Sequence, residues 1–221
     1  MTTQDDYEFV SRGGLKLWHA IQDFDLDIKD KVCCDLGCSV GGFVEAWLRA
    51  GAKKVYAVDT AYGQLAWKLR QDDRVVVLER KNALHVDVGE PCDFISVDLG
   101  WTKQDKAVPA ALRWLKDLDQ NPDARVISLI KPHYEMTFED RGLTEDEPPQ
   151  DVKKGKKHQG KGKKSKAKAK RLTDEEAAAV NNRVLTDVMP TLNVQVLGCI
   201  ESPIRGAKGG NIEFLANLKR L

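Results

Sequence analysis

The chain has 221 residues, 42% of them hydrophobic, and its 35 basic and 34 acidic residues give a formal net charge of +1. This composition is ordinary for a globular protein, and the length suffices for one domain with a large core. No apolar run approaches the ~18–20 residues of a membrane span, and the first ten residues lack the apolar core of a signal peptide. We therefore expect a soluble, cytoplasmic protein that does not enter a membrane.

Short apolar runs rich in Val and Ile alternate with helical patterns along the chain. The apolar runs predict buried strands at 31–37, 54–60, 74–80, 92–99, 124–132, 194–201 and 211–218. The helical patterns cover 13–24, 42–51, 63–72, 105–118 and 173–189. Such alternation predicts a doubly wound α/β domain over 1–221, with a mostly parallel seven-stranded sheet. The last two strands are joined without a helix, which predicts an antiparallel edge.

Charge is distributed unevenly. Residues 151–171 hold 11 basic residues and one acidic residue, a net charge of +10, whereas the rest of the chain carries a net charge of −9. The segment has almost nothing apolar to bury, so we expect a disordered insertion at 140–172 that seeks polyanions. A solvated linker without a partner is the alternative.

Five cysteines form no paired C-x-x-C sets. We expect buried free thiols in a reducing compartment and no metal site.

A glycine-rich turn follows the first predicted strand. Its sequence is Asp35-Leu36-Gly37-Cys38-Ser39-Val40-Gly41-Gly42-Phe43. Glycines between a strand and a helix let a ligand approach the backbone closely. The G-x-G-x-x-G pattern of dinucleotide sites is absent, and a carboxylate at the strand end would repel a pyrophosphate. An acid there suits a cofactor that carries an amine and a sulfonium.

Polar residues also end the next two strands. Asp59 is placed to hold ribose hydroxyls, and Asn82 is placed for an adenine edge. We therefore predict an S-adenosylmethionine site. Its expected residues are Asp35, Gly37, Ser39, Gly41, Gly42, Phe43, Asp59, Asn82 and Asp98.

Several longer motifs carry a resemblance to a known family. They are VSRGGLKL, DLGCSVGGF, KKVYAVDTAYGQLAWKLRQDDRVVVLER, LIKPHYE and SPIRGAKGGNIEFL. The chain resembles the FtsJ-like ribose 2′-O-methyltransferases, and most of all the haemolysin-A (TlyA) branch, which methylates ribosomal RNA. The resemblance covers roughly 9–138 and 173–218. It implies a Rossmann-like methyltransferase fold and a catalytic set that corresponds here to Lys16, Asp98, Lys131 and Glu213.

The chemistry explains why these residue types are needed. A ribose hydroxyl is a poor nucleophile and must lose its proton as the methyl group moves. A lysine accepts that proton only if burial or a second cation favours its neutral form, and two lysines supply such a pair. The two carboxylates would hold and orient the ammonium groups.

The branch usually carries an RNA-binding S4 domain before the S-R-G-G segment, and only ten residues precede Ser11 here. The lysine-rich segment could replace that RNA-binding surface through phosphate contacts, but the sequence does not tell whether it does. Trp101 is placed to stack a target base or to pack as a lid.

Two other function classes stay open. One is a non-catalytic RNA-binding or ribosome-assembly protein, and the other is a methyltransferase for proteins or small molecules. The oligomeric state is not predicted.

Overall fold

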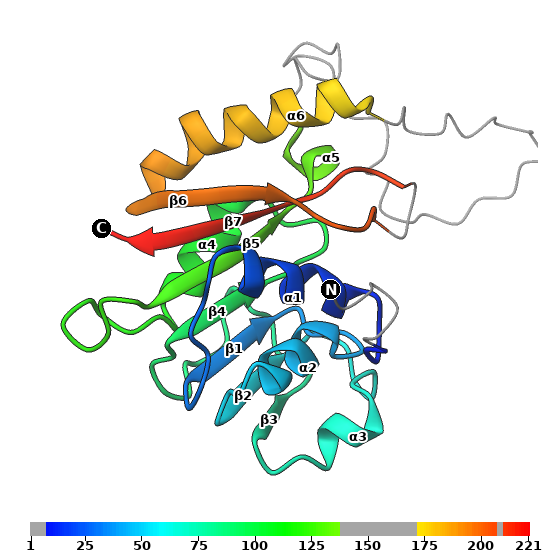
Figure 1. The fold of residues 1–221 in the computed structure, drawn as a ribbon, viewed down its shortest axis with the longest axis vertical. Helices are drawn as coiled ribbons and strands as arrows, with labels where there is room; N and C mark the ends of the chain where they lie inside the picture. The colour runs from blue at the N-terminus through cyan, green and yellow to red at the C-terminus, as the bar shows by residue number, and fades with distance from the viewer. Residues whose placement is uncertain (1–7, 138–171, 207–209) are drawn as a thin grey trace, which may run out of the picture.

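The computed structural model describes residues 8–137, 172–206 and 210–221. A seven-stranded sheet with the order β3-β2-β1-β4-β5-β7-β6 forms its centre (Figure 1). The strands are β1 Val32–Leu36, β2 Lys54–Val58, β3 Val75–Leu78, β4 Phe94–Val97, β5 Arg125–Ile130, β6 Val194–Glu201 and β7 Phe214–Arg220. All seven predicted strands are confirmed. The lysine-rich segment 151–171 lies outside the described residues.

The pairing confirms a mostly parallel sheet. Strands β1 to β5 pair in parallel, and β7 runs antiparallel to both of its neighbours, β5 and β6. Strand β6 is therefore the edge strand, and the antiparallel strand β7 lies between β5 and β6. The strand order reverses between β1 and β4, and the carboxyl ends of the parallel strands meet at one edge. In α/β sheets a ligand binds at this kind of switch point.

Helices cover both faces of the sheet, as Figure 1 shows. Helices α1 (Gly13–Asp23) and α2 (Gly42–Arg49) cover one face, where Leu17 and Trp47 are fully buried. Helix α4 (Gln104–Leu112) and the π and 3₁₀ turns at 184–192 cover the other, where Trp114 is fully buried. No helix in the described ranges is long and apolar enough to cross a membrane.

Tertiary contacts shorten some of the predicted helices. Helix α3 spans only Trp67–Arg70, because Gly63 adopts a left-handed φ of 73° and the chain before the helix is tied to the glycine-rich turn after β1 by a hydrogen bond from Ala66 N–H to Val40 O. Helix α4 ends at Leu112, since Cys92 bonds across to the residues beyond it.

Two helices flank residues 138–171, which lie outside the described ranges. The sequence analysis missed the short α5 (Pro132–Glu135). Helix α6 (Asp174–Arg183) follows its N-cap Thr173, whose side chain accepts the Glu176 N–H as part of a capping box.

Candidate active site

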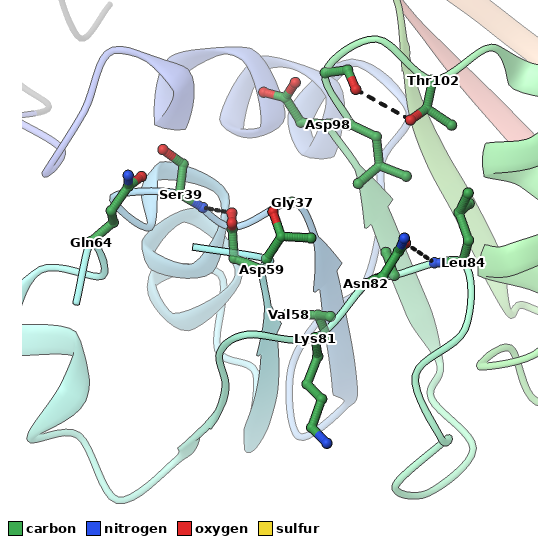
Figure 2. A pocket seen from close by; sticks show the side chains of 14 residues that line it. Gly37, Ser39, Val58, Asp59, Gln64, Lys81, Asn82, Leu84, Asp98 and Thr102 are labelled. Atoms are coloured by element: carbon green, nitrogen blue, oxygen red, sulfur yellow. Dashed lines mark hydrogen bonds between the residues drawn. The ribbon is translucent and has the colours of Figure 1, made fainter. Parts of the chain in front are cut away.

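A pocket of about 460 Å³ opens at the carboxyl edge of the sheet, beside the switch point (Figure 2). Its size falls within the range of small-molecule sites. The predicted cofactor residues that line it are Gly37, Ser39, Asp59, Asn82 and Asp98. The sequence analysis missed Thr60, Gln64, Lys81 and Thr102. Their signal was position, because Thr60 ends a predicted strand and the other three follow the end of one within a few residues.

The Asp59 carboxylate is held by the backbone. Its Oδ2 accepts the Ser39 N–H at 2.8 Å, and its Oδ1 accepts the Ala61 N–H at 2.7 Å. Ser39 has a left-handed φ of 47°, which turns its N–H toward the carboxylate. The bond from Ser39 joins the turn after β1 to the turn after β2, and the bond from Ala61 closes the turn after β2. Asp59 is therefore preorganised at the pocket wall, with lone pairs left for a ligand.

Asp35 lies within β1, is 1% exposed and is not one of the residues that line the pocket. Its Oδ1 accepts the Ser96 hydroxyl at 2.7 Å, while its Oδ2 is buried without a hydrogen-bond partner within the described chain. Burial, reinforced by the charges of Asp98 and Asp59, raises the pKa of Asp35 to about 8, although the bond from Ser96 lowers it. The carboxylates make this end of the pocket acidic, and a cationic ligand would favour ionised Asp35.

The remaining predicted cofactor residues, Gly41, Gly42 and Phe43, do not line the pocket. A Cβ on Gly42 would lie 2.4 Å from Ser11 Oγ and 2.7 Å from Gly14 N, so the start of α2 packs directly on the start of α1. A Cβ on Gly41 would meet Leu69 at 2.3 Å. These glycines let the turn after β1 pack closely against α1 and α3. Phe43 is buried in the core.

The four predicted catalytic residues form two ion pairs. Lys16 Nζ, on α1, donates to Glu213 Oε2 at 2.5 Å, just before β7. Lys16 is 8% exposed and Glu213 is 4% exposed. Lys131, after β5, donates to Asp98 Oδ1, after β4. Asp98 also lines the pocket, so the second pair borders it directly.

His133 responds to one residue of each ion pair. Burial is the main cause that lowers the pKa of His133, while the charge of Glu213 raises it and that of Lys131 lowers it. The structure thus brings residues from α1, β4, β5 and β7 together at one edge of the sheet.

An exposed aromatic side chain stands beside the Asp98–Lys131 pair. Trp101 is 85% exposed, and its ring centroid lies 4.9 Å from that of Tyr134. Its φ of 60° is a left-handed conformation that a bulky residue rarely adopts. Such strain at a candidate site is evidence for a constraint on where the ring points. Apart from this contact with Tyr134, most of the Trp101 side chain stays exposed.

The family follows from a direct comparison. A model of the FtsJ-like methyltransferase family matches residues 9–219. The chain belongs to the FtsJ-like methyltransferase family. The resemblance and the fold class predicted from the sequence are thereby confirmed.

Individual relatives agree with this family. Hemolysin A of Brachyspira hyodysenteriae is 34% identical over 95% of this chain and 76% of that protein. The 16S/23S rRNA (cytidine-2′-O)-methyltransferase TlyA of Mycobacterium tuberculosis is 38% identical over 62% of this chain and 50% of that protein. A solved structure of a protein assigned as a hemolysin from Lactococcus lactis is 32% identical, with a TM-score of 0.73, over 95% of this chain and 88% of that one. The chain spans about half the length of the first curated relatives that it matches.

The pocket fits the cofactor that a family of this kind implies. The buried Asp35 Oδ2 has no partner in the described residues, and three carboxylates favour a ligand with a positive charge. At Gly37, with φ of 97°, a Cβ would lie 2.5 Å from Asp98 O, so only glycine lets the two strand ends approach at the pocket floor.

Replacing Asp59 by alanine is expected to weaken the binding of S-adenosylmethionine by about 1–3 kcal/mol, because hydrogen bonds to a buried ligand are lost. Titration calorimetry measures the change. Asp73→Ala, an exposed aspartate in the turn before β3, is the matched control and should leave the affinity unaltered. Equal affinities of the Asp59 variant and the unaltered chain would remove Asp59 from the site.

Proposed function

We propose that the chain transfers a methyl group from S-adenosylmethionine to a ribose 2′-hydroxyl of ribosomal RNA. The observation that carries the proposal is the pair of lysine–carboxylate contacts, Lys16–Glu213 and Lys131–Asp98, the second of which borders the acidic pocket through Asp98. The names of the rRNA-methylating relatives support the choice of substrate. Such a substrate implies the cytoplasm as the location of the protein.

Different residues at this site would bind different parts of the cofactor. Asp59 would hold the ribose hydroxyls, Asn82 the adenine edge, and Asp35 and Asp98 the positive charge. The hydrogen bond from Leu84 N–H to Asn82 Oδ1, at 2.9 Å, fixes the amide so that its NH₂ group is free to turn toward a ligand (Figure 2). When bound, the cofactor supplies an electrophilic methyl group.

The ion pairs would provide the group that accepts the proton of the ribose 2′-hydroxyl. Lys131 Nζ would accept the proton of the 2′-hydroxyl, and Asp98 orients the amine toward it. Lys16, held in place by Glu213, would supply a second cation at the same edge of the sheet. Most of the remaining acceleration would come from the alignment of the hydroxyl oxygen with the methyl group.

The test is a transfer experiment with labelled cofactor. The protein is incubated with ribosomal subunits and with their extracted RNA, and the 2′-O-methylated positions are then mapped. We expect label in RNA at a ribose, and no label when the acceptor nucleotide is a 2′-deoxynucleotide. Tight cofactor binding without transfer to any RNA would contradict the proposal and favour a non-catalytic RNA-binding protein. Labelled protein or small molecules would favour another methyltransferase class.

RNA contact extends beyond the reacting ribose in this proposal. The charge of the segment 151–171 suits phosphates, which bind lysines without regard to sequence. The target base would stack on Trp101, whose exposed ring lies next to the Asp98–Lys131 pair.

Replacing Trp101 by alanine is expected to reduce kcat/KM for RNA by about 5- to 150-fold, because stacking of one base on an aromatic ring contributes about 1–3 kcal/mol. The melting temperature should stay the same, since the ring is exposed. Steady-state kinetics with varied RNA measures the effect. Trp67→Ala is the matched control, because Trp67 is 74% exposed on α3, away from the ion pairs. Equal losses in both variants would contradict a specific stacking role.

A further inference from the structure

A cluster of buried polar side chains lies behind the Asp98–Lys131 pair, outside the cofactor pocket. Gln104 is 3% exposed, Ser128 is fully buried, and Glu135 is 4% exposed. They come from the start of α4, from β5 and from α5. Polar side chains are costly to bury unless they are hydrogen-bonded, so the contacts in this cluster are informative.

Hydrogen bonds join the three side chains. Glu135 Oε1 accepts the Gln104 N–H at 2.9 Å. Ser128 Oγ donates to Gln104 Oε1 at 2.6 Å, and Gln104 Nε2 donates to Leu129 O at 3.3 Å. Gln104 is the first residue of α4, so Glu135 caps the start of that helix, where a negative charge is favourable. The hydrogen bonds of the Gln104 side chain with Ser128 and Leu129 hold the same residue against β5.

The cap connects the two segments that carry one catalytic pair. The loop before Gln104 begins at Asp98, and the turn of α5 that holds Glu135 begins at Lys131. Tyr134 N–H donates to Lys131 O at 2.8 Å, which closes that turn. Lys103 Nζ donates to Met136 O at 3.2 Å and makes a second link between the segments. A shift of α5 relative to α4 would therefore move Lys131 relative to Asp98.

We propose that Glu135 is a positioning residue, which holds the Lys131 turn against the Asp98 loop by capping α4 and so sets the geometry of the catalytic pair. The inference rests on the proposed function for its kinetic consequence, but the cap itself is a property of the fold. Arg183 on α6 supports the same turn, because its Nη2 donates to Glu135 O at 3.0 Å.

The cap is sensitive to pH. Burial is the main cause that raises the pKa of Glu135 to about 7; the Gln104 N–H, Lys103 and Arg183 lower it, and Asp105 raises it. Lys131 and His133 are the charged and titratable neighbours on its own turn. Above pH 7 the carboxylate is ionised and its bond to the helix start is charge-assisted, which makes it stronger than a neutral bond. Below pH 7 it becomes a neutral acceptor, and the cap weakens.

Glu135→Gln separates these states, because the amide oxygen can still accept the Gln104 N–H but never becomes charged. We expect the turnover of the unaltered chain to exceed that of the variant by about fivefold at pH 8, and the two to converge near pH 6. Dividing one profile by the other cancels the titration of the lysines. Glu175→Gln, which removes an exposed carboxylate from the first turn of α6, is the matched control and should give a flat ratio.

A second measurement makes the cap testable without turnover. The NMR signal of the Gln104 amide should shift with a midpoint near pH 7 in the unaltered chain and stay constant in Glu135→Gln. If the amide titrates but no RNA is methylated at any pH, the proposed function fails and the cap remains. If RNA is methylated but the activity ratio is independent of pH, Glu135 has no positioning role. A Gln104 amide that does not titrate near pH 7 overturns the pH-sensitive cap.

Discussion

Lys131→Ala is expected to lower the rate of methyl transfer by on the order of 10²–10⁴-fold, because the variant loses the amine that accepts the proton of the 2′-hydroxyl. The loss should appear in kcat, since the role of the amine is realised in the transition state. Lys131 does not line the cofactor pocket, so affinity for S-adenosylmethionine should change little. Single-turnover kinetics with saturating RNA and calorimetry of cofactor binding measure the two quantities.

The control for this variant is Lys106→Ala, on the exposed side of α4. The Lys106 side chain is 70% exposed and contacts only the neighbouring Asp105 within the described ion pairs. Its removal should leave transfer unaltered. A rate for Lys131→Ala within a few-fold of the unaltered chain would exclude Lys131 as the proton acceptor, even if the RNA methyltransferase activity itself were established.

The second large effect is expected from Glu213→Ala, which should lower the free energy of unfolding by about 3–5 kcal/mol and abolish transfer. The substitution leaves the ammonium of Lys16 without its partner at a position that is only 8% exposed. Breaking a buried pair by removing one member costs more than the pair contributes, because the remaining charge is desolvated without compensation. Urea denaturation of both chains measures the change.

Two further variants separate folding from catalysis. Glu201→Ala removes an exposed carboxylate at the end of β6 and should change stability by no more than about 0.5 kcal/mol. The double variant Lys16→Met with Glu213→Met replaces the buried pair by apolar side chains of similar length. It should recover most of the stability but none of the activity. Recovery of activity in the double variant would show that the pair has only a structural role.

Much of the sheet was predictable because its signal is local. A parallel strand that is covered on both faces needs a continuous apolar run, and each such run in the sequence became a strand. The polar residues directly after those runs became the wall of the pocket, Asp59 and Asn82 among them. Periodicity and turn chemistry act over a few residues, so strand positions and the residues at their ends could be identified without a structure.

Helix ends were less predictable, because contacts from distant segments decide them. Gly63 and the bond between Ala66 and Val40 delay the start of α3, and the bridge from Cys92 ends α4. The glycines after β1 show the same limit. Their spacing indicates a close approach of backbone, but only the tertiary structure shows that α1 makes that approach at Gly42 and the side chain of Leu69 at Gly41.

The sequence by itself determined which charged residue accompanies each strand: Asp35 within β1, an acid after β2 and after β4, and a lysine after β5. Only the tertiary structure decided which lysine pairs with which carboxylate. Lys16 and Glu213 are 197 positions apart, and they meet because β7 returns through the sheet next to β5 while the glycines bring α1 down onto α2. Likewise, nothing local marks Glu135 as the cap of α4, since a side chain finds a distant helix start only after both elements have packed on β5.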